Sequence, residues 1–329
     1  MTRVLTGVLL LAVAGAVAAG QSQNATTPEQ TAGMSQSANP DLARPDLMRL
    51  IARYELAVRD AEAAHADHAR MANLYADLAT LYEEAGMPLK AEDAMERALV
   101  FLKDGPQQSL AEEFEQLAVL HVTMGDMRAA QKSATHALQI RQAIGDPVGL
   151  ALSWNNLAGI DNDERKYKDA ADYAKNAFDV LADNPAVSPV VRMAVRQELG
   201  FALTGDRECN RGIPILQDAV GIATSAFGPE SFRAGYSEYV LGFGYWHCGD
   251  RENAALWMER GTTHMKADYG WNRAMYVNAM REYARFLRES GQRDAAVSAE
   301  AVVHQAEAVV DARTLAAGPS EGFRSAASK

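Results

Sequence analysis

The sequence predicts an all-α protein built as a solenoid of paired helices. Aromatic residues make up only 7% of the 329 residues while alanine is abundant, a composition that favours helices packed through small side chains. No stretch shows the sustained alternation of apolar and polar residues that is typical of a strand. One pattern of small residues returns six times at a spacing near 40 residues, which is the signature of stacked helix–turn–helix units.

Residues 1–20 have the pattern of a secretory signal peptide. Arg3 precedes an uncharged run from Val4 to Ala19, and small residues close the segment. As a helix, this run would span roughly 24 Å, which is shorter than a hydrocarbon core of about 30 Å. Cleavage is therefore favoured over retention as an anchor, and we expect a periplasmic or secreted protein.

The segments that flank the repeats differ from them in composition. Residues 21–44 are polar, small and contain prolines, which predicts a disordered linker, and residues 317–329 predict a flexible tail. Residues 45–71 predict an N-terminal capping helix, because apolar residues recur there at helical spacing: Leu47, Leu50, Ile51, Tyr54 and Val58.

The repeat is defined by a small residue that we call position s. With s at Ala158, a leucine precedes it, and alanines follow at s+12, s+16 and s+19. Small residues at s, s+12 and s+19 let the two helices of a unit cross closely, and glycine at s+7 lets the chain leave the first helix. The same frame returns at spacings of 39, 40, 42, 42 and 42 residues, with s at Ala79, Ala118, Ala158, Gly200, Gly242 and Ala284.

This frame resembles the tetratricopeptide repeat over about residues 72–310. The stretch "GDPVGLALSWNNLAGIDNDERKYKDAADYAKNAFDVL" is most similar to the 42-residue variety found in kinesin light chains. Arg165 and Arg207 depart from the pattern by replacing the turn glycine, and Asp161 replaces the usual aromatic at s+3. The resemblance implies a right-handed α-solenoid of about six repeats over residues 72–316, whose first helices line a concave groove that binds another polypeptide.

Positions s−6, s−3, s+1 and s+4 share one stripe of each first helix, because they lie three or four residues apart. Read along the array, this stripe passes from acidic residues such as Glu83 and Glu112 to amides, then to aromatic residues and finally to arginines. It supplies the candidate partner-binding residues: Asn155, Asn162, Gln197, Tyr236, Tyr239, Phe243, Trp246, Arg281, Arg285 and Arg288.

Each class on the stripe has its own chemistry. Amides can donate to and accept from the backbone of an extended peptide, and Asn155 matches the groove asparagine of the kinesin-light-chain-like repeats. Aromatic residues beside arginines suit a ligand with an apolar anchor next to an acidic or C-terminal group. Two alternatives stay open: the aromatic rings pack between repeats, and the arginines pair with Glu282 and Glu289 on a solvated face.

The two cysteines fall in the turns of adjacent repeats. Cys209 is at s+9 of repeat four and Cys248 at s+6 of repeat five. An oxidising compartment would allow a disulfide between them, provided that their Cα atoms approach to roughly 4.4–6.8 Å.

Several classes of function are disfavoured. A net charge of −11 is unsuited to nucleic acid, and no long apolar segment follows the signal. The sequence contains no Gly-rich phosphate loop, nucleophile elbow or metalloprotease pair, so we predict no catalytic residue, cofactor or metal. We predict an exported, non-enzymatic scaffold that binds a polypeptide. The alternatives are a self-assembling structural component of the cell envelope, and a binder of glycan or small ligand that uses the aromatics of repeat five.

Overall fold

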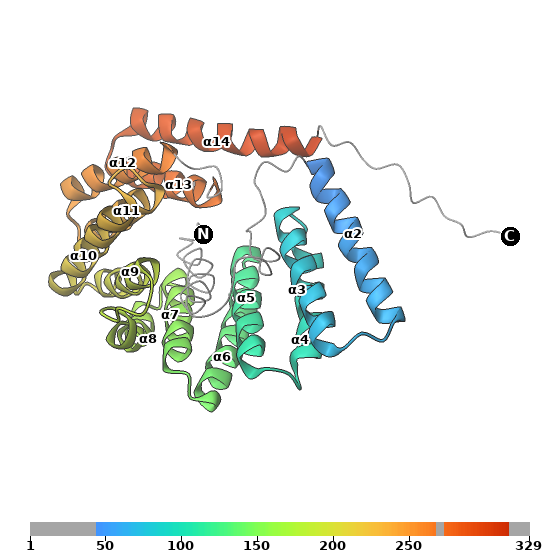
Figure 1. The fold of residues 1–329 in the computed structure, drawn as a ribbon. Helices are drawn as coiled ribbons and strands as arrows, with labels where there is room; N and C mark the ends of the chain where they lie inside the picture. Colours follow the sequence, from blue (N-terminus) through green and yellow to red (C-terminus); the bar gives the residue numbers. More distant parts are fainter. Residues whose placement is uncertain (1–43, 268–272, 316–329) are drawn as a thin grey trace.

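The computed structural model of the protein describes residues 44–267 and 273–315, and in these ranges the chain is an arc of helices without strands (Figure 1). Short turns connect consecutive helices, so neighbours run antiparallel. The described helices are α2 (Arg44–Ala63), α3 (His68–Glu84), α4 (Pro88–Leu102), α5 (Gln107–Met124), α6 (Met127–Ile144), α7 (Pro147–Asp163), α8 (Tyr167–Leu181), α9 (Pro189–Gly205), α10 (Cys209–Phe227), α11 (Phe232–His247), α12 (Arg251–Ala267), α13 (Arg273–Glu289) and α14 (Arg293–Leu315).

The six predicted repeats correspond to the pairs α3–α4, α5–α6, α7–α8, α9–α10, α11–α12 and α13–α14. Helix α7 contacts both α5 and α9, and α9 contacts α11. First helices of neighbouring repeats therefore contact one another directly, although a second helix separates them in the chain. The first helices therefore lie on the inner side of the arc (Figure 1). We call the surface formed by α3, α5, α7, α9, α11 and α13 the inner face. The predicted all-α solenoid is confirmed.

The small residues of the frame lie where the paired helices cross. Ala79, Ala158 and Ala170 are all fully buried, as the repeat frame requires. In repeats four and five glycine takes the place of alanine, and the helices approach more closely. A Cβ added to Gly242 would lie 2.6 Å from the backbone nitrogen of Met258, and one added to Gly261 would lie 2.4 Å from that of Tyr239.

The turns inside the repeats use a left-handed residue at s+7. Gly125 and Gly249 each have a φ of 82° there, which glycine adopts without a steric penalty. Arg165 and Arg207 occupy the same position in repeats three and four with φ of 61° and 69°. The turn is thus kept in all repeats, and the two arginines carry the strain of a conformation that side chains disfavour.

The predicted capping helix over residues 45–71 is shorter than expected. Helix α2 ends at Ala63, and His65 adopts a φ of 51° that interrupts the helical path. The Asp67 carboxylate then accepts a hydrogen bond from the backbone N–H of Arg70 and caps the start of α3. Residues 68–71 therefore belong to the first repeat. Apolar residues of α2, including Ile51 and Val58, pack against the first repeat.

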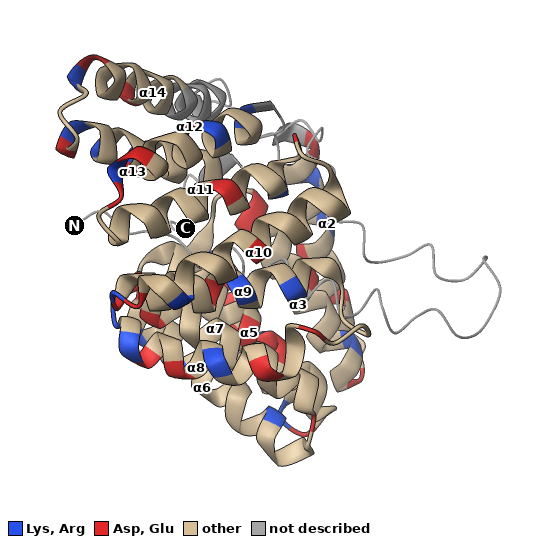
Figure 2. Ribbon diagram, turned by 90° about the vertical axis from the view of Figure 1, so that its left-hand side faces the viewer, with Lys and Arg blue, Asp and Glu red and all other residues tan. Residues whose placement is uncertain are grey.

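The predicted signal peptide (1–20), nearly all of the linker (21–44) and the tail (317–329) lie outside the described residues. Among the helices of the described part of the chain, none combines the length and the apolar character that crossing a membrane would require. Acidic and basic residues are spread over the whole array rather than segregated into one half (Figure 2).

Candidate functional site

The centre of the inner face carries three carboxamides from the predicted stripe. Asn155 and Asn162 lie on α7, and Gln197 lies on α9. All three side chains are buried. We call Asn155, Asn162 and Gln197 the amide row.

The amide row is not satisfied by the described residues around it. Neither the nitrogen nor the oxygen of the Asn155 amide has a hydrogen-bond partner in the described ranges. Asn162 donates to the Glu198 carboxylate at 2.8 Å and Gln197 donates to the Ser237 hydroxyl at 2.9 Å, but both amide oxygens lack a donor there. A buried polar group without a partner costs about 1–3 kcal/mol, so a ligand that supplied both donors and acceptors would recover that free energy.

Glu198 lies beside the amide row on α9 and directly follows Gln197 in the chain. Its side chain is 1% exposed, and its hydrogen bond from Asn162 is its only described polar contact apart from weaker electrostatic effects. Burial raises the pKa of Glu198 to about 8. The carboxyl is therefore largely protonated at neutral pH, which leaves the middle of the inner face polar but mostly uncharged.

The aromatic residues of repeat five pack against the neighbouring repeats, which is the alternative that the sequence left open for them. Phe243 is only 3% exposed, and its ring centroid lies 5.4 Å from that of Phe201 and 5.0 Å from that of Trp246. Tyr236 and Tyr239 are also buried and lie in the same hydrophobic cluster. These rings fill the space between repeats four, five and six and present no open face for a glycan. Trp246 is partly exposed, and its ring stacks under the Arg285 guanidinium.

The arginines of α13 share one side of that helix, as the stripe predicts. Arg281, Arg285 and Arg288 line a cavity of about 540 Å³ between α13 and α14. Arg285 pairs with Glu282 and Glu289 at 3.1 Å each, and Arg288 pairs with Glu300. Arg285 therefore lies on a charge-paired face, which was the alternative to ligand binding. Any ligand at this position would compete with these carboxylates.

The acidic positions of the stripe divide into two groups. Glu115 of α5 is buried and forms an ion pair with Arg141 of α6, with 3.4 Å between the charged atoms. It also accepts a hydrogen bond from Ser153 of α7 at 2.7 Å, so this carboxylate ties repeat two to repeat three. Its role is to join repeats. Glu83 and Glu112, in contrast, line a cavity.

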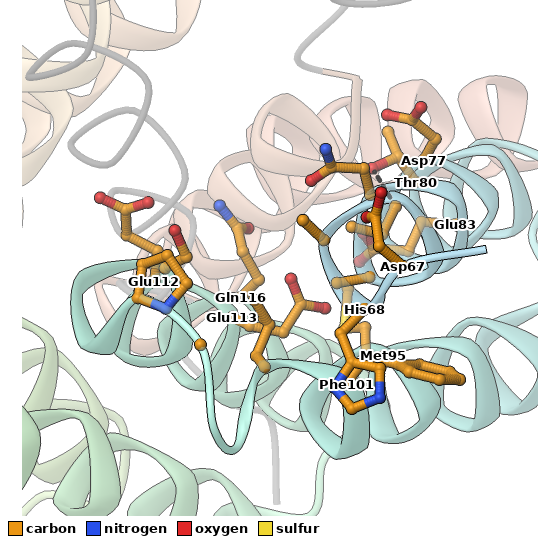
Figure 3. Close-up of a pocket in the computed structure, with 18 residues that line it drawn as sticks. Asp67, His68, Asp77, Thr80, Glu83, Met95, Phe101, Glu112, Glu113 and Gln116 are labelled. Atoms are coloured by element: carbon orange, nitrogen blue, oxygen red, sulfur yellow. Dashed lines mark hydrogen bonds between the residues drawn. The ribbon is translucent and has the colours of Figure 1, made fainter.

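This cavity, which we call the acidic pocket, lies between α3 and α5 at the first end of the inner face and has a volume of about 990 Å³ (Figure 3). All four stripe residues of repeat one line it: Asn73, Ala76, Thr80 and Glu83. From repeat two it is lined by Glu112, Glu113 and Gln116. Glu113 and Gln116 are not on the predicted stripe, because the pocket between the two helices is lined by the flank of α5 that faces α3. That flank lies one position along from the stripe.

Two carboxyl groups in the acidic pocket have strongly shifted ionisation. Burial, together with repulsion from Glu83, raises the pKa of Glu113 to about 7. Burial, with a smaller contribution from Glu84, raises the pKa of Glu83 to about 7 as well. Both groups therefore change charge close to neutral pH. Among the described residues, no cluster of histidine, cysteine and acidic side chains is arranged to hold a metal ion.

The predicted cysteine pair is joined in the structure. A disulfide links Cys209, at the start of α10, to Cys248, which follows α11, and the two Cα atoms are 5.8 Å apart. The bond connects the turn of repeat four with the turn of repeat five. It therefore fixes the relative position of the two repeats whose helices pack most closely.

No protein-family model and no curated protein matches the chain. Solved structures are similar to it in fold. The apo form of RapI superposes with a TM-score of 0.69 at 13% identity, over 82% of this chain and 94% of RapI. Aspartyl phosphate phosphatase F from Bacillus subtilis gives a TM-score of 0.59 at 13% identity, over 73% of this chain and 61% of that protein.

BtubC (BKLC) from P. vanneervenii gives a TM-score of 0.50 at 18% identity, over 74% of this chain and 95% of BtubC. At these identities the likeness shows the fold, which is that of tetratricopeptide-like repeat proteins. The resemblance inferred from the repeat frame is confirmed at that level.

Proposed function

We propose that this protein is an exported scaffold that binds an extended segment of another polypeptide along its inner face, with no chemical step. The observation that carries the proposal is Asn155, whose buried amide has no partner for either polar atom among the described residues. An extended peptide backbone offers an N–H and a C=O at every residue, which is the pairing that a carboxamide needs.

The two ends of the inner face support a polypeptide rather than a small molecule. The acidic pocket lies at the α3–α5 end, the amide row lies in the middle, and arginines lie on α13 at the other end. These sites belong to repeats one to four and to repeat six, so a ligand that reached all of them would have to be long.

Two features support export. Residues 1–20 have the composition of a signal peptide, and the Cys209–Cys248 disulfide suits an oxidising compartment. The name aspartyl phosphate phosphatase describes one protein of similar fold, and we do not extend that activity to this chain.

Photo-crosslinking in the native cell envelope tests the proposal. A photoreactive phenylalanine analogue replaces Asn73, which is exposed and lines the acidic pocket. The matched control carries the same analogue at Val100 of α4, which is 70% exposed and does not line the pocket. We expect covalent polypeptide adducts from position 73 only. A second change, Asn155→Ala, should lower the adduct yield while the melting temperature stays the same.

The identity of the adduct separates the alternatives. Equal labelling from both positions, or no adduct from position 73, would overturn the proposal. An adduct that consists of a second copy of the chain would favour the self-assembling structural component instead. An adduct of carbohydrate would favour the glycan binder, which would then need a surface other than the buried rings of repeat five.

A further inference from the structure

The acidic pocket differs from an ordinary solvated acidic face in its shape and in the charge of its lining. Eighteen residues line it, and five of them are acidic: Asp67, Asp77, Glu83, Glu112 and Glu113. None of the lining residues is lysine or arginine. The walls come from repeat one and repeat two together, so acidic side chains of both repeats line one cavity.

Glu113 is a buried acidic side chain of the pocket that has no partner among the described residues. Its side chain is only 8% exposed, and it makes no hydrogen bond or ion pair within the described part of the chain. In Figure 3 it points from α5 into the pocket, toward α3. Two other acids of the lining already have partners, since Asp67 caps α3 and Glu112 lies 3.8 Å from Arg141. The buried acid that faces the pocket therefore lacks a counter-charge.

We propose that the acidic pocket is a binding site for a cationic side chain, arginine or lysine, of the polypeptide that lies along the inner face. The proposal rests on the function proposed above and adds the chemistry of one end of the ligand. Glu83 and Glu113 would hold the cationic group between α3 and α5. A carboxylate that is buried without a partner gains most from such an ion pair, because its desolvation has already been incurred in the free protein.

The apolar part of the lining suits the stem of such a side chain. Ala72, Ala76, Met95 and Phe101 line the same cavity as the carboxylates. Lysine and arginine carry a methylene stem that packs on apolar surface while the charged head reaches polar groups. A bare inorganic cation would use none of this surface. The pocket is thus matched to an organic cation attached to a chain.

Binding of the cation should depend on pH. The other titratable groups that line the pocket are Asp67, His68, Asp77 and Glu112, and Glu84 lies beside Glu83. The pKa values of both Glu83 and Glu113 are raised to about 7, so these carboxyls are mostly neutral at pH 6 and mostly ionised at pH 8. The cation needs the ionised form. Its affinity should therefore rise by about tenfold between pH 6 and pH 8, with release of protons on binding.

Selection from a random 12-residue peptide display library on the full chain provides the test. We expect enriched peptides with arginine or lysine at one recurrent position. For one enriched synthetic peptide, replacing that arginine by citrulline, which is neutral and nearly the same shape, should weaken binding at least tenfold. The same loss is expected for the arginine peptide on the Glu113→Gln variant, and its affinity should rise with pH as above.

Matched variants keep the test decisive. Glu96→Gln removes one charge from the exposed side of α4, outside the pocket, and should leave binding unchanged. Glu83→Gln provides a second pocket variant should Glu113→Gln fold poorly, which a thermal melt would reveal. Equal binding of the citrulline peptide, an equal effect of Glu96→Gln, or an affinity independent of pH would each overturn the cationic site.

Two further outcomes separate the proposed function from the cationic site, and a peptide ligand from a polyamine. Failure to enrich any peptide would count against the proposed function itself, whereas enrichment without a basic position would overturn only the present inference. Spermidine serves as the probe for a free polyamine. If spermidine bound the full chain more tightly than the selected peptide and Glu113→Gln abolished its binding, the pocket would be assigned to a polyamine and the side-chain proposal would be wrong.

Discussion

Repeats one and two and repeats four and five follow the same frame yet differ in how closely their helices approach. In repeat one the frame residues Ala79 and Ala91 are fully buried, and a large cavity lined by both acidic and apolar side chains remains between α3 and α5. In repeats four and five glycine stands at s, the backbones nearly touch, and buried aromatic rings fill the inner face. One pattern of small residues thus supports both an open pocket and a closed core.

The difference follows from the side chains beside the frame. Small side chains such as Ala72 and Ala76 line the space between α3 and α5 beside the carboxylates, so no bulky ring fills it. The apolar rings of Phe201 and Phe243 are stabilised by burial against each other, so they fill the space between α9 and α11. The small residues of the frame determine how the two helices of a repeat pack. The residues beside the frame determine whether the inner face forms an open cavity or a filled hydrophobic core.

Removing the disulfide should have the largest effect on this comparison. Cys209 and Cys248 are 39 residues apart, and closing a loop of that size is worth roughly 4 kcal/mol in the chain-entropy model. The double change Cys209→Ser and Cys248→Ser should lower the free energy of unfolding by about that amount, measured by urea denaturation. Hydrogen exchange should rise in α9–α12 and stay unchanged in α3–α6. Faster exchange throughout the array would show that the two regions are not independent.

Adding a methyl group at the close contact between α11 and α12 should have the next largest effect. Gly261→Ala places a Cβ 2.4 Å from the Tyr239 nitrogen and 2.5 Å from the Gly235 oxygen, both of which are backbone atoms. We expect the free energy of unfolding to fall by about 1–3 kcal/mol, which thermal and urea unfolding would measure.

Gly221→Ala is the matched control for Gly261→Ala. Gly221 lies within α10, is exposed and has no atom within 4 Å of an added Cβ. Alanine should stabilise the protein there by about 0.5–1 kcal/mol, because it restricts the unfolded chain and favours helix. If both variants lost stability equally, close backbone packing in repeat five would not be the cause.

The fold was predictable because its signals are local and repeated. A small residue at s and another at s+12 can be read without knowing the tertiary structure, and Ala158 and Ala170 are both fully buried as expected. The break between α2 and α3 was not predicted, since neither His65 nor Asp67 interrupts the apolar spacing. The left-handed conformation of His65 and the capping hydrogen bond from the Arg70 backbone N–H to Asp67 reveal it in the structure.

The candidate site was predictable only in part. The stripe placed Asn155, Asn162 and Gln197 on the inner face, because residues of one class on one helix face stay together in any solenoid. It could not show whether Phe243 faces a ligand or Phe201, because that depends on the distance between neighbouring repeats. It also missed Glu113, whose importance arises from a cavity shared by two repeats.

Replacing a strained turn residue by glycine should have the smallest effect on stability. The size of this effect should differ between repeats three and four. Arg165 and Arg207 have nearly the same left-handed φ, but the Arg207 guanidinium donates to the backbone carbonyl of His247, whereas the Arg165 side chain is exposed and makes no described hydrogen bond. Arg165→Gly should therefore stabilise the protein by about 0.5–1 kcal/mol in urea unfolding, since glycine adopts this conformation freely. Arg207→Gly should gain less, because the contact to repeat five is lost with the side chain. Equal gains would mean that the Arg207 hydrogen bond contributes nothing to the junction that the disulfide also holds.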